Sequence, residues 1–140
     1  MAEDFELEIA TPDRLLVRDH ALRAQIPCLD GYIGVLPEHA PLLSELGIGV
    51  LTFVTPQDVH YSMAIKQGFV EVLDNHVRVL ADTAERGNEI DTTQAQKDLE
   101  KAQQEMTNPV IDMDIAAALI AWKHAQARID AARKQANKEE

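Results

Sequence analysis

Cysteine, aromatic side chains and positive charge are all scarce in this chain, and each shortage excludes a class of structure or partner. Cys28 is the only cysteine, so the chain cannot form an internal disulfide, and we expect a small buried hydrophobe in a reducing compartment. Aromatic residues make up 4% of the sequence, so the core has to be built from Val, Leu, Ile and Ala. The same shortage argues against an aromatic-lined pocket for a small molecule.

Long apolar runs are missing as well. No stretch approaches the ~20 residues that a membrane-spanning helix needs. The N-terminal M-A-E-D-F has neither the basic flank nor the apolar run of a signal peptide. We therefore expect a soluble protein without direct membrane insertion, which reaches a membrane only through a partner.

Positive charge is outnumbered, with 13 Lys and Arg against 24 Asp and Glu and a net charge of −11. Nucleic acid is not an expected partner, because phosphate binding needs clustered Lys and Arg. Residues 1–90 carry a net charge of −9 and residues 91–140 one of −2. The basic side chains gather in one segment near the C-terminus: Lys123, Arg128, Arg133, Lys134 and Lys138. The helix dipole accounts for the last three and leaves Lys123 and Arg128 less well explained.

Motifs for catalysis are absent from the sequence. It contains no G-x-S-x-G nucleophile elbow, no Walker-type phosphate loop and no G-x-G-x-x-G fingerprint. The five histidines show neither H-x-H nor H-E-x-x-H spacing, and there is no C-x-x-C pair. We expect no catalytic residue, no metal site and no cofactor, which also argues against a metal-dependent enzyme of cupin type.

Residues 1–86 are predicted to form strands. Phe5, Leu7 and Ile9 alternate with glutamates, and similar alternation occurs in residues 22–26 and 61–65. Asp74-Asn75-His76 separates two β-rich runs and predicts a tight hairpin. Pro27 is expected to stop strand pairing, and Leu43 to Leu46 to form a short turn. This pattern predicts an antiparallel β-sandwich as the first part of an α+β fold.

The stretch G-Y-I-G-V-L-P-E-H-A-P-L, residues 31–42, stands out within this half. Its two glycines permit backbone angles with φ > 0, and its two prolines fix φ. We expect a stiff loop, neither helix nor paired strand, with Glu38 and His39 as a polar pair at its tip. Loops on a rigid scaffold often bind partners. A purely structural corner is the alternative that the residues alone leave open.

Residues 87–140 change to a helical period, with Gly87 expected as a hinge. Asp91 is suited to cap a helix, and Gln94 three residues on suggests a capping box. The first helix is expected to carry the apolar stripe Ala95, Leu99, Ala102 and Met106. The second, from near Asp112 or Asp114, is expected to carry Ile115, Leu119, Trp122, Ala125, Ile129 and Ala132. We predict an antiparallel αα-hairpin, so rich in alanine that it is only weakly held and able to leave its docking place.

Several of these segments together resemble one family. The string G-x-I-G-V-L-P-x-H-A-P-L is similar to a loop of the ATP synthase epsilon subunit. G-F-V-E-V at residues 68–72, V-R-V-L-A-D-T-A-E at 77–85 and E-I-D at 89–91 extend the resemblance over nearly the whole chain. It implies a non-catalytic rotor subunit on the cytoplasmic face of the bacterial inner membrane. Residues 1–86 would bind gamma and the c-ring, and residues 87–140 would form a regulatory hairpin that extends into the α/β catalytic head and restrains ATP hydrolysis.

The resemblance also implies candidate site residues. One end of the family's sandwich rests on the c-ring, where some members carry an acidic residue at the position of Tyr32, so here the contact would use Glu38 and His39. Some bacterial members bind regulatory ATP through I/L-D-x-x-R-A, and this chain has Gln94 in place of the arginine. Asp91 and Arg128 are then the weak nucleotide candidates that remain.

The sequence therefore favours one function and leaves one alternative. The first is the epsilon subunit, with Lys123, Arg128 and Arg133 on a regulatory helix whose acidic partners would be the chain's own β domain or the catalytic head. The alternative is a free-standing β-sandwich that binds a small molecule.

Overall fold

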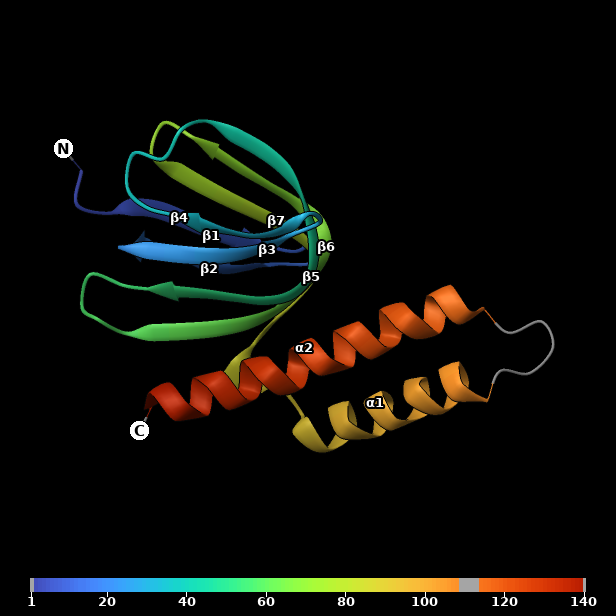
Figure 1. Cartoon of the computed structure of the whole chain (residues 1–140). Helices are drawn as coiled ribbons and strands as arrows, with labels where there is room; N and C mark the ends of the chain where they lie inside the picture. Colours follow the sequence, from blue (N-terminus) through green and yellow to red (C-terminus); the bar gives the residue numbers. More distant parts are fainter. Residues whose placement is uncertain (1, 109–113, 140) are drawn as a thin grey trace.

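A computed structural model of the chain describes residues 2–108 and 114–139. The strands come first and the helices follow (Figure 1). The strands are β1 (Phe5–Ala10), β2 (Leu15–Ala21), β3 (Arg23–Cys28), β4 (Gly31–Val35), β5 (Leu42–Val54), β6 (His60–Leu73) and β7 (His76–Arg86). The helical elements are η1 (Gly87–Glu89), α1 (Thr92–Thr107) and α2 (Ile115–Glu139). The predicted fold class, a β-sandwich followed by two helices, is confirmed.

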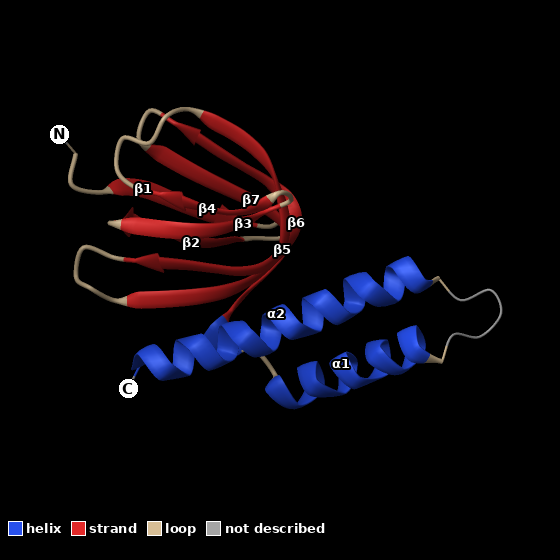
Figure 2. Ribbon diagram, in the orientation of Figure 1, coloured by secondary structure: helices blue, strands red, loops and turns tan. Residues whose placement is uncertain are grey.

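The described strands form one sheet in the order β2-β1-β7-β6-β5-β3-β4. The long strands β5, β6 and β7 bend, so the sheet curls over onto itself and its two layers enclose a core (Figure 2). All pairs are antiparallel except β1 and β7, which run parallel from Glu6↔His76 to Ala10↔Leu80. Strand periodicity carries no information on this pairing, because a parallel and an antiparallel neighbour bury the same alternate residues.

Aliphatic side chains fill the core. Phe5, Leu7 and Ile9 are fully buried, which confirms the alternation expected for the first strand. The neighbouring strands of the same layer add Val77 and Val79 of β7, which pair with Leu7 and Ile9, and Val70 and Val72 of β6, which pair with Val79 and Val77. In β6 the residues from Ser62 to Ile65 are all buried, because one side of the strand faces this core and the other is covered by α2.

The prediction for residues 31–42 was wrong in part. Gly31–Val35 forms the edge strand β4, paired only with β3, and Leu42 already begins β5, so the loop is limited to residues 36–41. Leu43 to Leu46 is likewise strand rather than turn. Gly31 has φ of 127°, whereas the second glycine of the stretch, Gly34, does not take a positive φ. An edge strand needs hydrogen bonds on one side only, and for this reason it tolerates such an interrupted sequence.

Pro27 does not end its strand. It pairs with Tyr32 of β4, and the register between β3 and β5 is interrupted between Gln25 and Cys28. Proline has no N–H to donate, and the interruption falls where that donor is missing. The expected Asp74-Asn75 hairpin is confirmed, with φ of 51° and 61° at its two central residues.

The two helices run side by side and antiparallel, with α2 against the sheet (Figure 1). Asp91 caps α1 by accepting a hydrogen bond from the Gln94 N–H at 3.0 Å, as predicted. Gln94 does not complete the capping box, because its side chain donates to Asp98 instead. Asp114 accepts from the Ala117 N–H at the start of α2, and Asp112 lies outside the described residues.

The predicted apolar face of α2 was wrong in detail. Ile115 and Leu119 are exposed, and the buried positions are mostly alanines: Ala118, Ala125, Ala127 and Ala131. Helix α2 packs against α1 and the sheet at once, so its buried surface spreads around the helix instead of forming one stripe.

Candidate functional site

The loop of residues 36–41 is tied down at the end of the sandwich where β6 turns into β7. The Glu38 N–H donates to Oδ1 of Asn75 at 2.8 Å, and Nδ2 of Asn75 donates to the carbonyl of Asp4 at 2.9 Å. Glu38 has φ of 63°, a conformation that a non-glycine residue keeps only where its surroundings hold it. Nδ1 of His39 lies 2.7 Å from the Ala40 carbonyl. Asn75 thus fixes the backbone of Glu38, the first residue of the polar pair that the sequence singled out.

Tyr32 lies at the other end of β4, away from this loop. Its hydroxyl accepts a hydrogen bond from the Val50 N–H at 3.0 Å, and it lines a groove of about 490 Å³ together with Trp122 and Lys123 of α2. Of the three candidates, Glu38 and His39 therefore share the loop of residues 36–41, whereas Tyr32 lies apart from them.

A second feature is an apolar surface on the outer face of β5, β6 and β7. Its members are Leu43, Phe69 and Leu80, with exposed fractions of 73%, 51% and 58%. Phe69 pairs with Leu80, and Leu43 pairs with Glu71, two residues further along β6. Residues i and i+2 of a strand point to the same side, so the three side chains share one face. Exposed clusters of large apolar residues mark contact surfaces.

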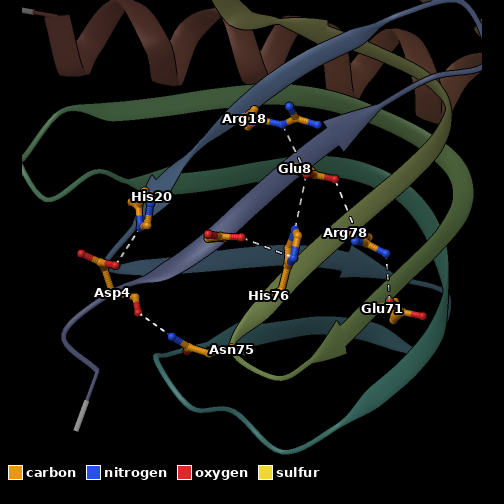
Figure 3. A network of polar contacts seen from close by, with 9 residues as sticks. Asp4, Glu8, Arg18, His20, Glu71, Asn75, His76 and Arg78 are labelled. Atoms are coloured by element: carbon orange, nitrogen blue, oxygen red, sulfur yellow. Dashed lines mark hydrogen bonds and ion pairs between the residues drawn. The ribbon is translucent and has the colours of Figure 1, made fainter.

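Charged side chains join β2, β1, β7 and β6 across another part of the outer face (Figure 3). Nδ1 and Nε2 of His76 each lie 3.5 Å from a carboxylate, of Glu6 and Glu8 respectively. Glu8 also lies 3.3 Å from Arg18 and 3.6 Å from Arg78. Such cross-strand pairs contribute roughly 0.2–1 kcal/mol each. This network links neighbouring strands.

Arg128 of α2 holds the helices to the sheet. Its Nε lies 2.8 Å from Glu85 of β7, and one of its terminal nitrogens donates to the same carboxylate at 3.2 Å. The other lies 3.6 Å from Asp98 of α1. The Arg128 side chain is 15% exposed, so water weakens these ion pairs less than it weakens surface pairs. Lys123 and Arg133, the other candidates on this helix, are exposed.

Gln135 makes the second polar connection between α2 and the sheet. It is buried, its Oε1 accepts from the Ser62 N–H at 2.7 Å, and its Nε2 donates to the His60 carbonyl at 3.1 Å. Gly87 lies beneath it: an added Cβ would come within 2.6 Å of the Ala131 carbonyl oxygen and of the Gln135 side chain. Gly87, expected as a hinge, is therefore a point of close contact with α2.

A groove of about 450 Å³ runs between α1, α2 and β6. Six charged or titratable side chains line it: Lys66, Asp98, Lys101, Glu105, His124 and Arg128. Burial lowers the pKa of His124 below its usual 6.5, and the nearby charges of Lys66 and Arg128 lower it further, against the opposing effect of Glu85 and Asp98.

The nucleotide candidates Asp91 and Arg128 are both engaged within the chain, Asp91 as the cap of α1 and Arg128 with two carboxylates.

Within residues 2–108 and 114–139, no group of His, Cys, Asp and Glu side chains is placed to hold a metal ion. Cys28 is buried, and burial raises the pKa of its thiol, as expected for a structural cysteine.

Sequence reasoning missed three residues that position these features. Asn75 was interpreted only as a turn residue, although Asn in a tight turn has a side chain free to bond elsewhere. Glu85 was noted only as the last residue of a family string, and Gln135 not at all, because each acts on a residue more than forty positions away in the chain.

These features define a class of protein: a β-sandwich with exposed contact surfaces and a helical hairpin docked on its side. A family model described as the ATP synthase Delta/Epsilon chain, beta-sandwich domain, matches residues 4–87. The ATP synthase epsilon chain of Solibacter usitatus is 48% identical over 135 residues, 96% of this chain and 100% of that one. The epsilon chain of Syntrophomonas wolfei is 43% identical, over 96% of this chain and 98% of the other.

The chain therefore belongs to the family of ATP synthase epsilon chains, which are non-catalytic subunits. The alternative of a free-standing small-molecule module is not favoured. Solved structures with the same fold include a chain of the Euglena gracilis mitochondrial ATP synthase OSCP/F1/c-ring assembly, with a TM-score of 0.82 at 23% identity. That match covers 95% of this chain and 83% of the other.

A chain of the Tetrahymena thermophila mitochondrial ATP synthase central stalk and c-ring matches with a TM-score of 0.57 at 17% identity, over 92% of this chain and 93% of that one. Neither helix of the described residues combines the length and apolarity needed to cross a membrane.

Proposed function

We propose that this chain couples the gamma subunit to the c-ring in the rotor of an F-type ATP synthase, bound peripherally at the cytoplasmic face of a bacterial inner membrane. The observation that carries the proposal is the apolar surface of Leu43, Phe69 and Leu80, left uncovered in a chain of the epsilon family. In an acidic protein such a surface needs a partner, and gamma is the partner that we assign to it.

The division of labour follows the two parts of the chain. Residues 1–86 bind gamma through the apolar surface and the c-ring through the loop of Glu38 and His39. Residues 87–140 regulate ATP hydrolysis, and they are either docked on the β domain or extended towards the α/β catalytic head. The alanine-rich contact of α2 with the sheet supports this second role, since small side chains bury little area per residue.

We expect regulatory nucleotide binding by this chain to be weak or absent. A nucleotide phosphate between the helices would have to compete with Glu85 and Asp98 for Arg128, and Gln94 supplies no charge in place of the family's arginine. Titration calorimetry of the full chain with ATP is expected to show no binding below the millimolar range. Micromolar binding would contradict this part of the proposal.

The gamma assignment is tested by introducing a charge into the apolar surface. Phe69→Lys and Leu80→Lys are each expected to weaken binding to purified gamma by roughly 30-fold or more, because central interface residues typically contribute about 2 kcal/mol or more. Val59→Lys, at an exposed apolar position in the turn between β5 and β6, is the matched control and should bind as the parent does. Parent-level binding by all three variants would remove the assignment.

The c-ring assignment is tested by the double variant Glu38→Ala, His39→Ala in reconstituted ATP synthase. Contacts at a polar rim contribute about 0–1 kcal/mol each, so we expect a partial loss of proton-coupled ATP synthesis with unchanged binding to gamma. The control is Asp13→Ala, an exposed carboxylate between β1 and β2. If the double variant couples ATP synthesis to proton flow as well as the parent does, the assignment of this loop to the c-ring contact is wrong.

A further inference from the structure

We propose that the docked hairpin is an acid-released latch: His124 lies in the groove between α1, α2 and β6 beside Lys66 and Arg128, and its protonation loosens the hairpin from the β domain. The consequence for ATP hydrolysis rests on the proposed function, whereas the latch itself is a property of the isolated chain.

The first argument is the way in which α2 is held. Its buried contact with the sheet joins the small residues Ala127 and Ala131 to Val50 and Ala64, with Ile48 and Ile90 only partly buried beside them, and apolar burial there is therefore limited. The polar contacts of Arg128 and Gln135 supply the remainder. A contact with so little apolar area is sensitive to a single added charge.

The second argument is what the docked state leaves uncovered. Ile115 and Leu119 of α2 are 50% and 41% exposed, although both belong to the apolar positions of the helix. Docking thus buries only part of the apolar surface of α2. The released hairpin can bury these side chains against another surface, which offsets part of the cost of leaving the sheet.

The third argument is the charge around His124. From β6 the groove presents Lys66; from α1 it presents Asp98, Lys101 and Glu105; from α2 itself it presents Arg128, one helical turn from His124. Glu85 of β7 and Asp98 are already paired with Arg128. A proton on His124 therefore adds positive charge where Glu85 and Asp98, the two carboxylates that favour the charged imidazole, are shared with Arg128.

Burial and the charges of Lys66 and Arg128 lower the pKa of His124 in the docked state below 6.5. When the hairpin leaves, the imidazole regains water and returns towards its usual pKa. Protonation thus favours release. Docking is strongest above pH 6.5, weakens as the pH falls below that value, and levels off below the pKa of the docked state.

The test follows hairpin docking in the full chain by amide hydrogen exchange of α2 between pH 5 and 8, corrected for intrinsic exchange rates. Ring titrations of all histidines are recorded by NMR on the same samples. The parent should lose protection in α2 as the pH falls. By linkage, the fold-change should equal ten raised to the difference between the pKa of His124 in the released and docked states.

The decisive variant is His124→Gln, which cannot be protonated and should show no pH response in α2. His20→Gln is the matched control, since His20 lies exposed on β2 beside Asp4, and it should respond as the parent does. His60→Gln is a stricter control, because the His60 carbonyl accepts from Gln135 at the same contact. A parent-like response in His124→Gln would overturn the proposal.

A second measurement does not depend on that variant folding. Replacing Lys66→Gln removes one repelling charge, so the pKa of His124 should rise and the loss of protection at low pH should shrink. A parent chain in which His124 titrates at 6.5 or above would overturn the latch.

In the assembled complex, ATP hydrolysis by the parent should fall more steeply below pH 6.5 than hydrolysis by His124→Gln. A hairpin that is released by acid while hydrolysis stays unaffected would leave the latch standing and contradict the inhibitory role.

Discussion

At the scale of single residues, Gly87 shows how one missing side chain permits two parts of the chain to meet. The backbone of η1 approaches α2 so closely that a Cβ would lie 3.0 Å from the Ser62 carbonyl and nearer still to Ala131 and Gln135. Gly34 offers the contrast, because an added Cβ there would meet nothing within 4 Å.

Gly87→Ala is therefore expected to destabilise the docked hairpin by about 1–3 kcal/mol, the usual effect of overpacking a close contact. Gly34→Ala should change stability by no more than about 0.5 kcal/mol. Urea unfolding followed by helix circular dichroism measures both. Equal midpoints for the two variants would mean that α2 does not pack on Gly87 in solution.

His20 provides a second test at this scale, with the opposite sign to His124. Its hydrogen bond to Asp4 raises the pKa of His20 above 6.5. A raised pKa contributes stability below pH 6.5 that is lost as the pH rises through the pKa of the folded state. We expect NMR titration to give a pKa of His20 above 6.5, and the substitution Asp4→Asn to lower that pKa towards 6.5. A titration below 6.5 would show that this pair does not form.

At the scale of elements, β6 and α2 are joined by side chains that complete each other's hydrogen bonds. The Ser62 N–H is buried and depends on Gln135 for its acceptor. Leaving a buried donor without a partner costs about 1–3 kcal/mol.

Gln135→Leu should accordingly raise the exchange rate of the Ser62 amide by roughly 5- to 150-fold, the range that corresponds to that cost. Gln103→Leu, on the exposed side of α1, is the control and should leave Ser62 unchanged. A Ser62 amide that exchanges at the parent rate in Gln135→Leu would show that its protection comes from the strand alone.

At the scale of the whole molecule, the basic helix contains two kinds of cation. Arg128 is engaged with the chain's own carboxylates, whereas Lys123 and Arg133 are exposed and available to another acidic surface. Reversing these charges should therefore have opposite effects on an inhibitory hairpin, because one change weakens docking and the other weakens the contact with the catalytic head.

In reconstituted complexes we expect Arg128→Glu to deepen inhibition of ATP hydrolysis and the double variant Lys123→Glu, Arg133→Glu to relieve it. Truncation after Glu89 should relieve it fully, with assembly unchanged. Because the exposed contact is screened over a Debye length of about 8–10 Å, added salt should also relieve inhibition in the parent. A truncated complex that hydrolyses ATP at the parent rate would show that this hairpin is not an inhibitor.

The sequence by itself determined which segments form strands and helices and where most of them begin and end. The alternation of Phe5, Leu7 and Ile9, the Asp74-Asn75 turn and the cap at Asp91 are local features, each set by residues a few positions apart. Local chemistry of that kind is readable from a single chain because strand, turn and helix geometry fix which neighbours meet.

Only the tertiary structure decided what those elements do to one another. The strand in residues 31–35 depends on β3 as its partner, the parallel pair depends on where β7 returns, and the buried face of α2 depends on having α1 and the sheet on two sides. Glu85 and Gln135 act across 43 and 73 positions of sequence. No periodic pattern records such contacts, because they exist only once the core of the sandwich has brought distant segments together.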